Sequence, residues 1–459
     1  MQRWSLLGCL VLAACANHAQ QAVALYENGD YAGAARAADR GLASHPGDEG
    51  LWQMRVRAAL AQGDGPGVAT AYAAYRGQLG GDDDKPLLRE LAIATLGQAL
   101  ASPSARLKIT AIGAVADAEL QDLAETVAAR MADDDDRVVA AAAVAVLNGY
   151  PDAPRAAGEM LHSEDPEARR IAVDGIGQKV GKLATADLEK AGADPDARVR
   201  RAALRWLGQL KDADAVELLT RRLHDPDDAV RAAAASALAR IGIGNLPELG
   251  KLALRDRALA VRLAGIELLV AAHLVETERE LTALADDPDP IVAAEAALAV
   301  GGGERAARAI DRAASSDEWT IRAGAANLAV RALGAPAAVV LAKKLAADPE
   351  LAVRLAAARV LAHGGDKPAA AAIFVTALES PDLALQAAID LADQDDARGI
   401  RALDATVRDP AQSPSARSAA AAAHRTARRV TPGLVAALAD ASGVVRVEAA
   451  AALAVLTRR

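Results

Sequence analysis

The segment from Asp225 to Gly242 constrains the fold more than any other feature, because variants of it recur along most of the chain. Its apolar residues recur at spacings of three and one, which places them on one face of an α-helix. An Asp-Pro pair and two further aspartates stand at its start, where a capping carboxylate, a first-turn proline and negative charge all favour a helix. We therefore expect Asp225 to cap a helix that ends at Gly242, because glycine readily adopts the backbone conformation at which helices stop.

Copies of this segment fill the chain from residue 101 to residue 459. Aligned on Arg231, about twelve copies follow one another at a mean step of about 31 residues. Many are preceded by Asp-Pro or Ser-Pro, and many first helices are closed by glycine, Gly334 among them. A shorter apolar-striped helix follows, as at residues 216–223. One such helix pair cannot bury its apolar face alone, so neighbouring pairs must stack. The predicted fold is all-α, a right-handed α-solenoid of helix-pair repeats that forms a curved rod.

Composition agrees with this architecture and excludes several functions. Aromatic residues are only 2% of the chain, which closely stacked small helices tolerate better than a globular core does. The net charge of −9 argues against a nucleic-acid backbone as the main partner, although it leaves room for a local basic face. Cys9 and Cys15 are the only cysteines, so the folded body has no internal disulfide and no Cys/His metal spacing.

The first fifteen residues are typical of an export signal. A basic start precedes an apolar run from Trp4 to Ala14, which is too short to span a bilayer. The run ends at Leu12-Ala13-Ala14-Cys15, which resembles the lipobox of bacterial lipoprotein signals. The resemblance implies that residues 1–14 are removed, that Cys15 is lipidated and that residues 15–20 form a tether. The alternative is an ordinary secretory signal in which Cys15 is incidental.

The residue after Cys15 bears on the location of the protein. It is Ala16 rather than the aspartate that often marks inner-membrane retention in such lipoproteins. The resemblance therefore implies a protein anchored to the outer membrane and facing the periplasm, with exposure at the cell surface as the other option. The expected partners are other proteins of the cell envelope, together with the membrane itself through the lipid on Cys15.

Residues 21–100 carry a different repeat, in which Gly29-Asp30 recurs 34 residues later as Gly63-Asp64. The pattern resembles the tetratricopeptide repeat, with small residues and a proline at the expected places, and implies two such repeats capping the array. Five of the ten aromatic residues of the chain lie here. Among them Tyr26, Tyr31 and Trp52 are candidates for partner binding; alternatively, the rings form the core of the repeats themselves.

The main repeats carry Asp-Pro-x-x-x-Val-Arg, an alanine-rich helix and Leu-Gly. This resembles the short HEAT repeats of bilin-lyase-like proteins, and the resemblance implies the fold without transferring any functional residue. Because the aspartate and arginine recur so regularly, we expect a structural ladder. Each aspartate should cap its helix, and each arginine should reach an aspartate or the turn carbonyls of a neighbouring repeat.

Departures from the repeat are the candidate functional positions. Val139, Ala293 and Gln386 stand where other repeats have the arginine. The four acidic residues just before Val139 are a candidate docking point for a basic partner, or else an over-capped, solvated helix start: Asp133, Asp134, Asp135 and Asp136. Trp319 lies three residues before Arg322, near a helix start. It is either an exposed binding anchor or a half-buried contact between repeats.

No motif for catalysis appears in the chain. There is no nucleophile elbow, phosphate loop or zinc motif, and the seven histidines are scattered singly. We therefore expect no catalytic, cofactor-binding or metal-binding residue, and a non-enzymatic scaffold that binds proteins through the solenoid surface. The alternative is an enzyme or enzyme accessory, such as a tetrapyrrole or cell-envelope factor. A cleft that gathers a histidine with two or more carboxylates from distant repeats would favour that alternative.

Overall fold

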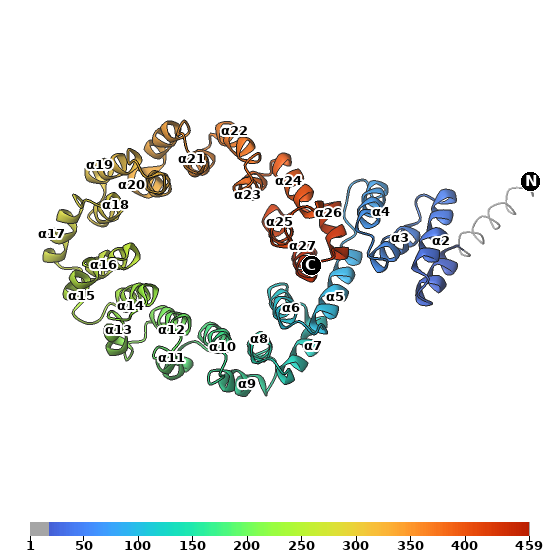
Figure 1. The fold of residues 1–459 in the computed structure, drawn as a ribbon, viewed down its shortest axis with the longest axis horizontal. Coiled ribbons are helices and arrows are strands. Elements are labelled where there is room, and N and C mark those ends of the chain that lie inside the picture. Colours follow the sequence, from blue (N-terminus) through green and yellow to red (C-terminus); the bar gives the residue numbers. More distant parts are fainter. Residues whose placement is uncertain (1–17, 459) are drawn as a thin grey trace, which may run out of the picture. The chain divides into compact units, whose positions relative to one another are not determined.

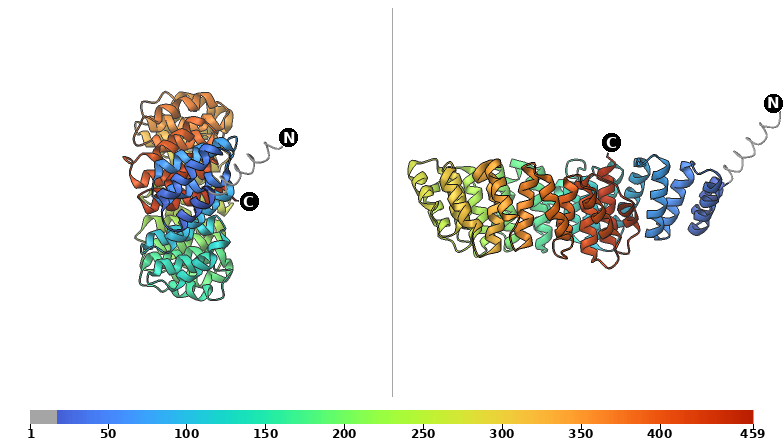
Figure 2. Two further views of the ribbon diagram at one scale, coloured as in Figure 1. Left: turned by 90° about the vertical axis from the view of Figure 1, so that its right-hand side faces the viewer. Right: turned by 90° about the horizontal axis from the view of Figure 1, so that it is seen from above.

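The computed structural model describes residues 18–458, and every regular element in that range is a helix (Figure 1). The predicted all-α solenoid is therefore confirmed. The helices form two compact units. Unit 1 contains residues up to Val127 together with Ala388–Arg459, and unit 2 contains Ala128–Ala387. Within each unit, neighbouring helices run roughly parallel or antiparallel to one another (Figure 2). The predicted signal peptide and lipidated Cys15 lie outside the described residues.

Unit 2 consists of stacked helix pairs. Its elements are η2 (Ala129–Ala132), α8 (Asp136–Ala145), α9 (Ala153–Met160), α10 (Pro166–Lys179), η3 (Gly181–Ala184), α11 (Thr185–Ala191), α12 (Ala197–Leu210), α13 (Val216–Arg222), α14 (Asp228–Ile241), α15 (Leu246–Leu254), α16 (Leu259–Ala272), α17 (Val275–Leu284), α18 (Pro290–Ala299), α19 (Gly303–Ala314), α20 (Trp319–Leu345), α21 (Leu351–His363) and α22 (Lys367–Ala377). Helices α8, α10, α12, α14, α16 and α18 form an inner layer, and the helices between them form an outer one (Figure 1). Alanine, leucine and valine from both layers fill the core.

The start of α14 differs from the sequence prediction by two residues. Asp227, not Asp225, caps the helix, because its carboxylate accepts the backbone N–H of Val230 at 3.0 Å. Asp225 lies in the preceding turn, where its carboxylate accepts the N–H of Asp227 and is fully buried. The Asp-Pro pair therefore shapes the turn before this helix. The predicted stop is confirmed, since Gly242 has a left-handed φ of 74°.

Helix α20 is the only described helix whose length and mean hydropathy would let it cross a membrane. Its backbone breaks at Gly334, which has φ 73° and ψ 162°, and Pro336 follows. The element is thus two helices of the repeat joined without a loop, and it packs against α19 and α21. The break confirms the prediction that Gly334 closes a first helix.

The predicted ladder is present and links successive repeats. In each rung an arginine side chain donates two hydrogen bonds to an aspartate of the next repeat, at 2.7–3.0 Å. The rungs are Arg169–Asp194, Arg200–Asp225, Arg231–Asp256, Arg322–Asp348 and Arg417–Asp440. The same arginines also donate to carbonyls of their own turn, as Arg200 does to Asp194 and Pro195.

Two details of the ladder differ from prediction. In the first complete rung the arginine is Arg169, one residue before the expected Arg170, which instead pairs with Glu167 and Asp174 of its own helix. The ladder aspartate also lies before the helix cap instead of forming it, as at Asp225. The structure therefore uses one residue for the ladder and another for the helix cap, whereas the sequence prediction gave both roles to one aspartate.

Unit 1 brings together the two ends of the described chain. Its elements are a helix at residues 18–27, α2 (Tyr31–Ser44), α3 (Glu49–Ala61), α4 (Gly65–Gln78), α5 (Lys85–Leu100), α6 (Ala105–Asp117), η1 (Gln121–Leu123), α24 (Ala397–Arg408), α25 (Pro414–Ala427), α26 (Pro432–Ala436), η4 (Ala437–Ala439) and α27 (Gly443–Leu456). Two helices, α7 (Ala124–Ala128) and α23 (Ala384–Asp393), cross the boundaries between the units. Both boundaries lie within about a repeat of a ladder break, at Val139 and at Gln386.

The last repeat packs on the N-terminal helices, and we call this contact the latch. It joins α27 to α5 and α6, and α26 to α4. Arg458 donates to the carbonyls of Asp117 and Ala118 and pairs with Glu119 at 2.9 Å. Arg76 donates to the carbonyl of Val430. Within unit 1 the last repeat is therefore covered by the helices that follow the N-terminal repeats.

A buried histidine lies beside the latch. His424 is fully buried in α25, where Nδ1 is 2.9 Å from the carbonyl of Ala420 and Nε2 is 3.1 Å from the hydroxyl of Thr431. That hydroxyl in turn accepts the N–H of Leu434 at the start of α26. Burial lowers the pKa of His424, opposed by the Ala420 carbonyl and by Asp404. The histidine is therefore held neutral, with Nδ1 as the donor.

This arrangement predicts that unit 1 loses stability in mild acid. Because the folded pKa lies below the unfolded value of about 6.5, protons bind the unfolded state first as the pH falls. The contribution of neutral His424 to the free energy of unfolding is fully present above pH 6.5. Below that pH the free energy of unfolding should fall by up to about 1.4 kcal/mol per pH unit. Thermal unfolding of the wild type and His424→Gln at pH 7.5 and pH 5.5 measures the difference. Equal pH dependence of the two proteins would contradict the assignment.

Candidate functional site

The candidate site is a groove of about 860 Å³ on the inner layer of unit 2. It crosses α14, α16 and α18 and reaches α20. Its lining residues are Ala239, Arg240, Leu263, Ile266, Glu267, Val270, Ala271, Glu295, Leu298, Ala299 and Arg331. The floor is apolar and the rim is charged, which is the composition of a surface that binds another polypeptide.

A ladder defect lies beneath this groove. Ala293 is fully buried on α18 where a ladder arginine would stand. The preceding rung is also altered, since Arg262 makes a single bond of 2.6 Å to Asp289, the cap of α18, instead of a two-bond pair. Helix α18 packs less extensively on α16 and on α20 than α14 packs on α16. The looser stacking leaves the side chains of Val270 and Leu298 accessible between helices.

The rim of the groove holds both paired and unpaired charges. Glu295 on α18 and Arg331 on α20 form an ion pair with a shortest distance of 2.9 Å. Arg240 and Glu267 are exposed, and neither forms an ion pair or side-chain hydrogen bond with any residue of the described range. The two unpaired charges are thus available to a partner at little desolvation cost, and they favour a partner that carries both signs of charge.

Large apolar side chains are exposed mainly in the same part of unit 2. Of the eleven exposed ones in the described chain, nine lie between Ile243 and Val340, and only Val23 and Leu183 lie elsewhere. Single exposed apolar residues are ordinary, and these nine lie on both layers, so Val270 matters here because it lines the groove. Val270, which lines the groove, is 40% exposed.

Trp319, a predicted binding anchor, is the first residue of α20 and is 46% exposed. Leu259 holds the equivalent position at the start of α16 and is 37% exposed. Neither residue lines the groove, and each is the first residue of its helix. Partner binding by Trp319 stays a prediction.

The predicted acidic docking point is largely used within the fold. Asp135 caps α8 and binds Arg137 through both oxygens, and hydrogen bonds from Arg137 lower its pKa. Asp136 accepts the hydroxyl of Ser163, and Asp133 accepts the N–H of Asp135. Only Asp134 is exposed. Three of the four carboxylates therefore serve the helix start, and docking of a basic partner stays a prediction.

The aromatic residues of the N-terminal helices are partly buried and contact one another. The rings of Tyr26 and Tyr31 are 5.2 Å apart. Trp52 donates its indole N–H to the carbonyl of Pro46 at 2.7 Å and stacks on Tyr75, at 6.4 Å between ring centroids. Burial and a hydrogen bond to Asp84 raise the pKa of Tyr75 to about 12. These contacts agree with rings that form a local core, and partner binding by them stays a prediction.

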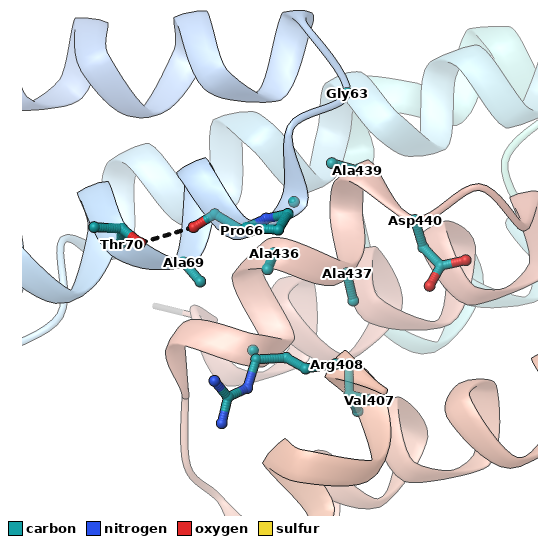
Figure 3. Close-up of a pocket in the computed structure, with 12 residues that line it drawn as sticks. Gly63, Pro66, Ala69, Thr70, Val407, Arg408, Ala436, Ala437, Ala439 and Asp440 are labelled. Atoms are coloured by element: carbon teal, nitrogen blue, oxygen red, sulfur yellow. Dashed lines mark hydrogen bonds between the residues drawn. The ribbon is translucent and has the colours of Figure 1, made fainter. Parts of the chain in front are cut away.

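Two other hollows do not form a site. One, in unit 1, lies between the start of α4 and the residues before α27 (Figure 3); its polar groups Thr70, Arg408 and Asp440 are bound to Pro66, Asp404 and Arg417. The other, between α13 and α16, is lined by His224, Asp225 and Asp256. Both of its carboxylates are ladder members already held by arginine, and they come from adjacent repeats. No group of three or more metal-binding side chains occurs in residues 18–458.

One comparison with known proteins identifies the repeat type in part of unit 2. A family model of HEAT repeats matches residues 154–239 and, overlapping them, residues 185–269. No curated protein sequence matches the chain.

Solved structures also match. Human deoxyhypusine hydroxylase in complex with glycerol is 23% identical over 55% of this chain and 94% of its own, with a TM-score of 0.27. The CpcE–CpcF complex of phycocyanin lyase from Nostoc sp. is 21% identical over 61% and 89%, with a TM-score of 0.24. The UNC-45 chaperone is 13% identical over 92% and 73%, with a TM-score of 0.27. At these values the likenesses carry no functional argument.

Sequence reasoning missed the groove, although the repeat alignment contains its signal. Counted from the ladder arginines, Leu263 lies one residue after Arg262, and Glu267 and Val270 lie five and eight residues after it. These positions face away from the helix core. Comparing them between repeats, instead of seeking only the repeats that lack arginine, would have revealed a change from charged to apolar residues.

Proposed function

We propose that the chain is a non-enzymatic scaffold that binds a partner protein through the groove of unit 2. The observation that carries the proposal is an accessible apolar floor, with Leu263, Val270 and Leu298 inside a charged rim. Apolar anchors surrounded by a polar rim supply most of the binding energy in protein interfaces. Trp319, at the start of α20, would extend the contact.

Substitution in the groove tests this function. Val270→Asp adds a charge to the apolar floor and should reduce co-purification of the bound partner at least tenfold, as loss of a central contact does. Val270 is 40% exposed, so the fold should tolerate the change. Leu183→Asp is the matched control, because Leu183 is apolar and 91% exposed in η3, away from the groove. Equal loss of the partner in both variants, or in neither, would refute the groove as the site.

We also propose that the scaffold is tethered to the outer membrane by lipid on Cys15 and faces the periplasm, where envelope proteins would be its partners. The lipobox-like sequence supports this, and two tetratricopeptide-like repeats at residues 21–100 would follow the tether. Cys15→Ala should move the protein from the membrane fraction to the soluble fraction, because several acyl chains on one residue make a stable anchor. Unchanged membrane attachment would exclude lipidation at this residue.

A further inference from the structure

The face that contains the groove continues onto α12, where its chemistry changes. Arg200, Arg231 and Arg262 are equivalent ladder residues of α12, α14 and α16. One residue further along stand Arg201 on α12, Ala232 on α14 and groove-lining Leu263 on α16. These helices are neighbours in the inner layer (Figure 1). The same surface position is therefore basic, then small, then apolar along the array.

A second position is also basic on α12, but it becomes acidic on α16 and apolar only on α18. Five residues after each ladder arginine stand Arg205, Ser236 and Glu267, and in the next repeat the corresponding residue is Leu298. Arg205 is half exposed. It lies 5.6 Å from the ring centroid of Trp206 and pairs with Asp174 of α10. Trp206 in turn packs against Gly177 of α10, where a Cβ would meet the ring at 2.5 Å. Contacts with α10 therefore fix the positions of Trp206 and Arg205 on α12.

Arg201 differs from the other arginines of α12 because its guanidinium group has no partner. It is exposed, and it makes no ion pair or side-chain hydrogen bond within the described chain. On α12 itself, Arg198, Arg201 and Arg205 follow at helical spacing on the exposed face. Arg198 pairs with Asp196 at the helix start and Arg205 pairs with Asp174, so Arg201 carries the one unpaired charge of the three. A free guanidinium beside an aromatic-supported arginine, in a protein of net charge −9, is a local basic surface.

We propose, on the basis of the proposed function, that the partner segment is acidic at one end and apolar at the other. Its carboxylates would pair with Arg201 and Arg205, its backbone would cross the small residues of α14, and its apolar side chains would enter the groove at Leu263 and Val270. Helices pack about 8–10 Å apart, so α12 and α16 are about 16–20 Å apart, which an extended chain spans in about five or six residues. The recognised pattern is therefore a carboxylate pair separated from apolar anchors by that length.

Designed peptides test this pattern on the full chain. The probes are fluorescein-labelled peptides with two glutamates, a five-residue Gly/Ser spacer and two leucines, made in both orders, and counterparts with lysine in place of glutamate. Fluorescence anisotropy should show that one glutamate peptide binds at least tenfold more tightly than its lysine counterpart. That preference should weaken as salt rises. Arg201→Glu should remove it, whereas Arg305→Glu should not, because Arg305 is an equally exposed arginine on α19.

The outcomes separate the two proposals. If glutamate and lysine peptides bind equally, or if Arg201→Glu leaves the preference intact, the acidic pattern is wrong while the apolar groove stands. If no peptide binds, the pattern is overturned, and the proposed function is decided by the Val270→Asp comparison alone. Loss of binding in Val270→Asp together with loss of charge preference in Arg201→Glu would establish one continuous surface.

Discussion

Arg200→Ala is expected to lower the free energy of unfolding of unit 2 by about 3 kcal/mol, because it removes the main partner of a buried carboxylate and leaves only the longer contact with Arg222, at 3.5 Å. The Asp225 side chain has no solvent exposure, and both of its oxygens accept hydrogen bonds from Arg200 at 2.7–2.9 Å. Burial alone would raise the pKa of Asp225, but the bonds from Arg200 and from the N–H of Asp227 outweigh it and hold the pKa below its usual value. Urea denaturation followed by circular dichroism measures the loss.

Two controls distinguish the ladder from ordinary surface charge. Replacing both partners, as Arg200→Met with Asp225→Leu, should cost much less than the single change, because no buried charge is left unpaired. Arg221→Ala breaks an exposed pair with Glu217 and should cost at most about 1 kcal/mol. If Arg200→Ala cost no more than Arg221→Ala, the ladder would not support the repeat stack.

Removal of the last helix is expected to unfold the surface it covers at the other end of the chain. Deleting α27 exposes the faces of α5 and α6 that it packs against. Hydrogen exchange in those two helices should accelerate at least 100-fold, while exchange in α10 to α16 stays unchanged. Equal acceleration in both units, or no change in α5, would contradict the latch.

A point substitution tests the latch without removing a helix. A Cβ at Gly443 would lie 2.6 Å from Cδ1 of Leu107, so Gly443→Val must displace that side chain from the contact between α27 and α6 and should cost about 1 kcal/mol. Gly113→Ala is the matched control on α6, because no atom lies within 4 Å of its Cβ position. That change should be neutral or stabilise by up to about 1 kcal/mol.

Most of the local structure could be predicted from the sequence, because several features of each repeat specify the same helix pair. The apolar stripe, the terminal glycine and the recurring arginine specify each helix pair, and the break at Gly334 could be placed to the residue. The cap of α14 was misplaced because two aspartates, Asp225 and Asp227, compete for one role. Only the position of Arg200, one repeat away, decides which of them turns toward the ladder.

Long-range features could not be predicted in the same way. Contact between α27 and α5 joins helices that lie near opposite ends of the sequence, and no residue near Gly443 indicates that partner. The groove depends on the stacking between α16 and α18, the helix that carries Ala293 in place of a ladder arginine. The sequence marked that position as a break but gave no indication of which neighbouring side chains would become accessible.

Site-specific photo-crosslinking in the cells that produce the protein tests the central claim most directly. A photoreactive residue at Val270, in the groove, is compared with one at Leu183, which is apolar and exposed in η3. We expect one discrete crosslinked protein from the residue at Val270 and none from the residue at Leu183. If the acidic pattern holds, the Val270 product should disappear when Arg201→Glu is added. The same products from both positions, or none from Val270, would contradict a scaffold that binds its partner through the groove of unit 2.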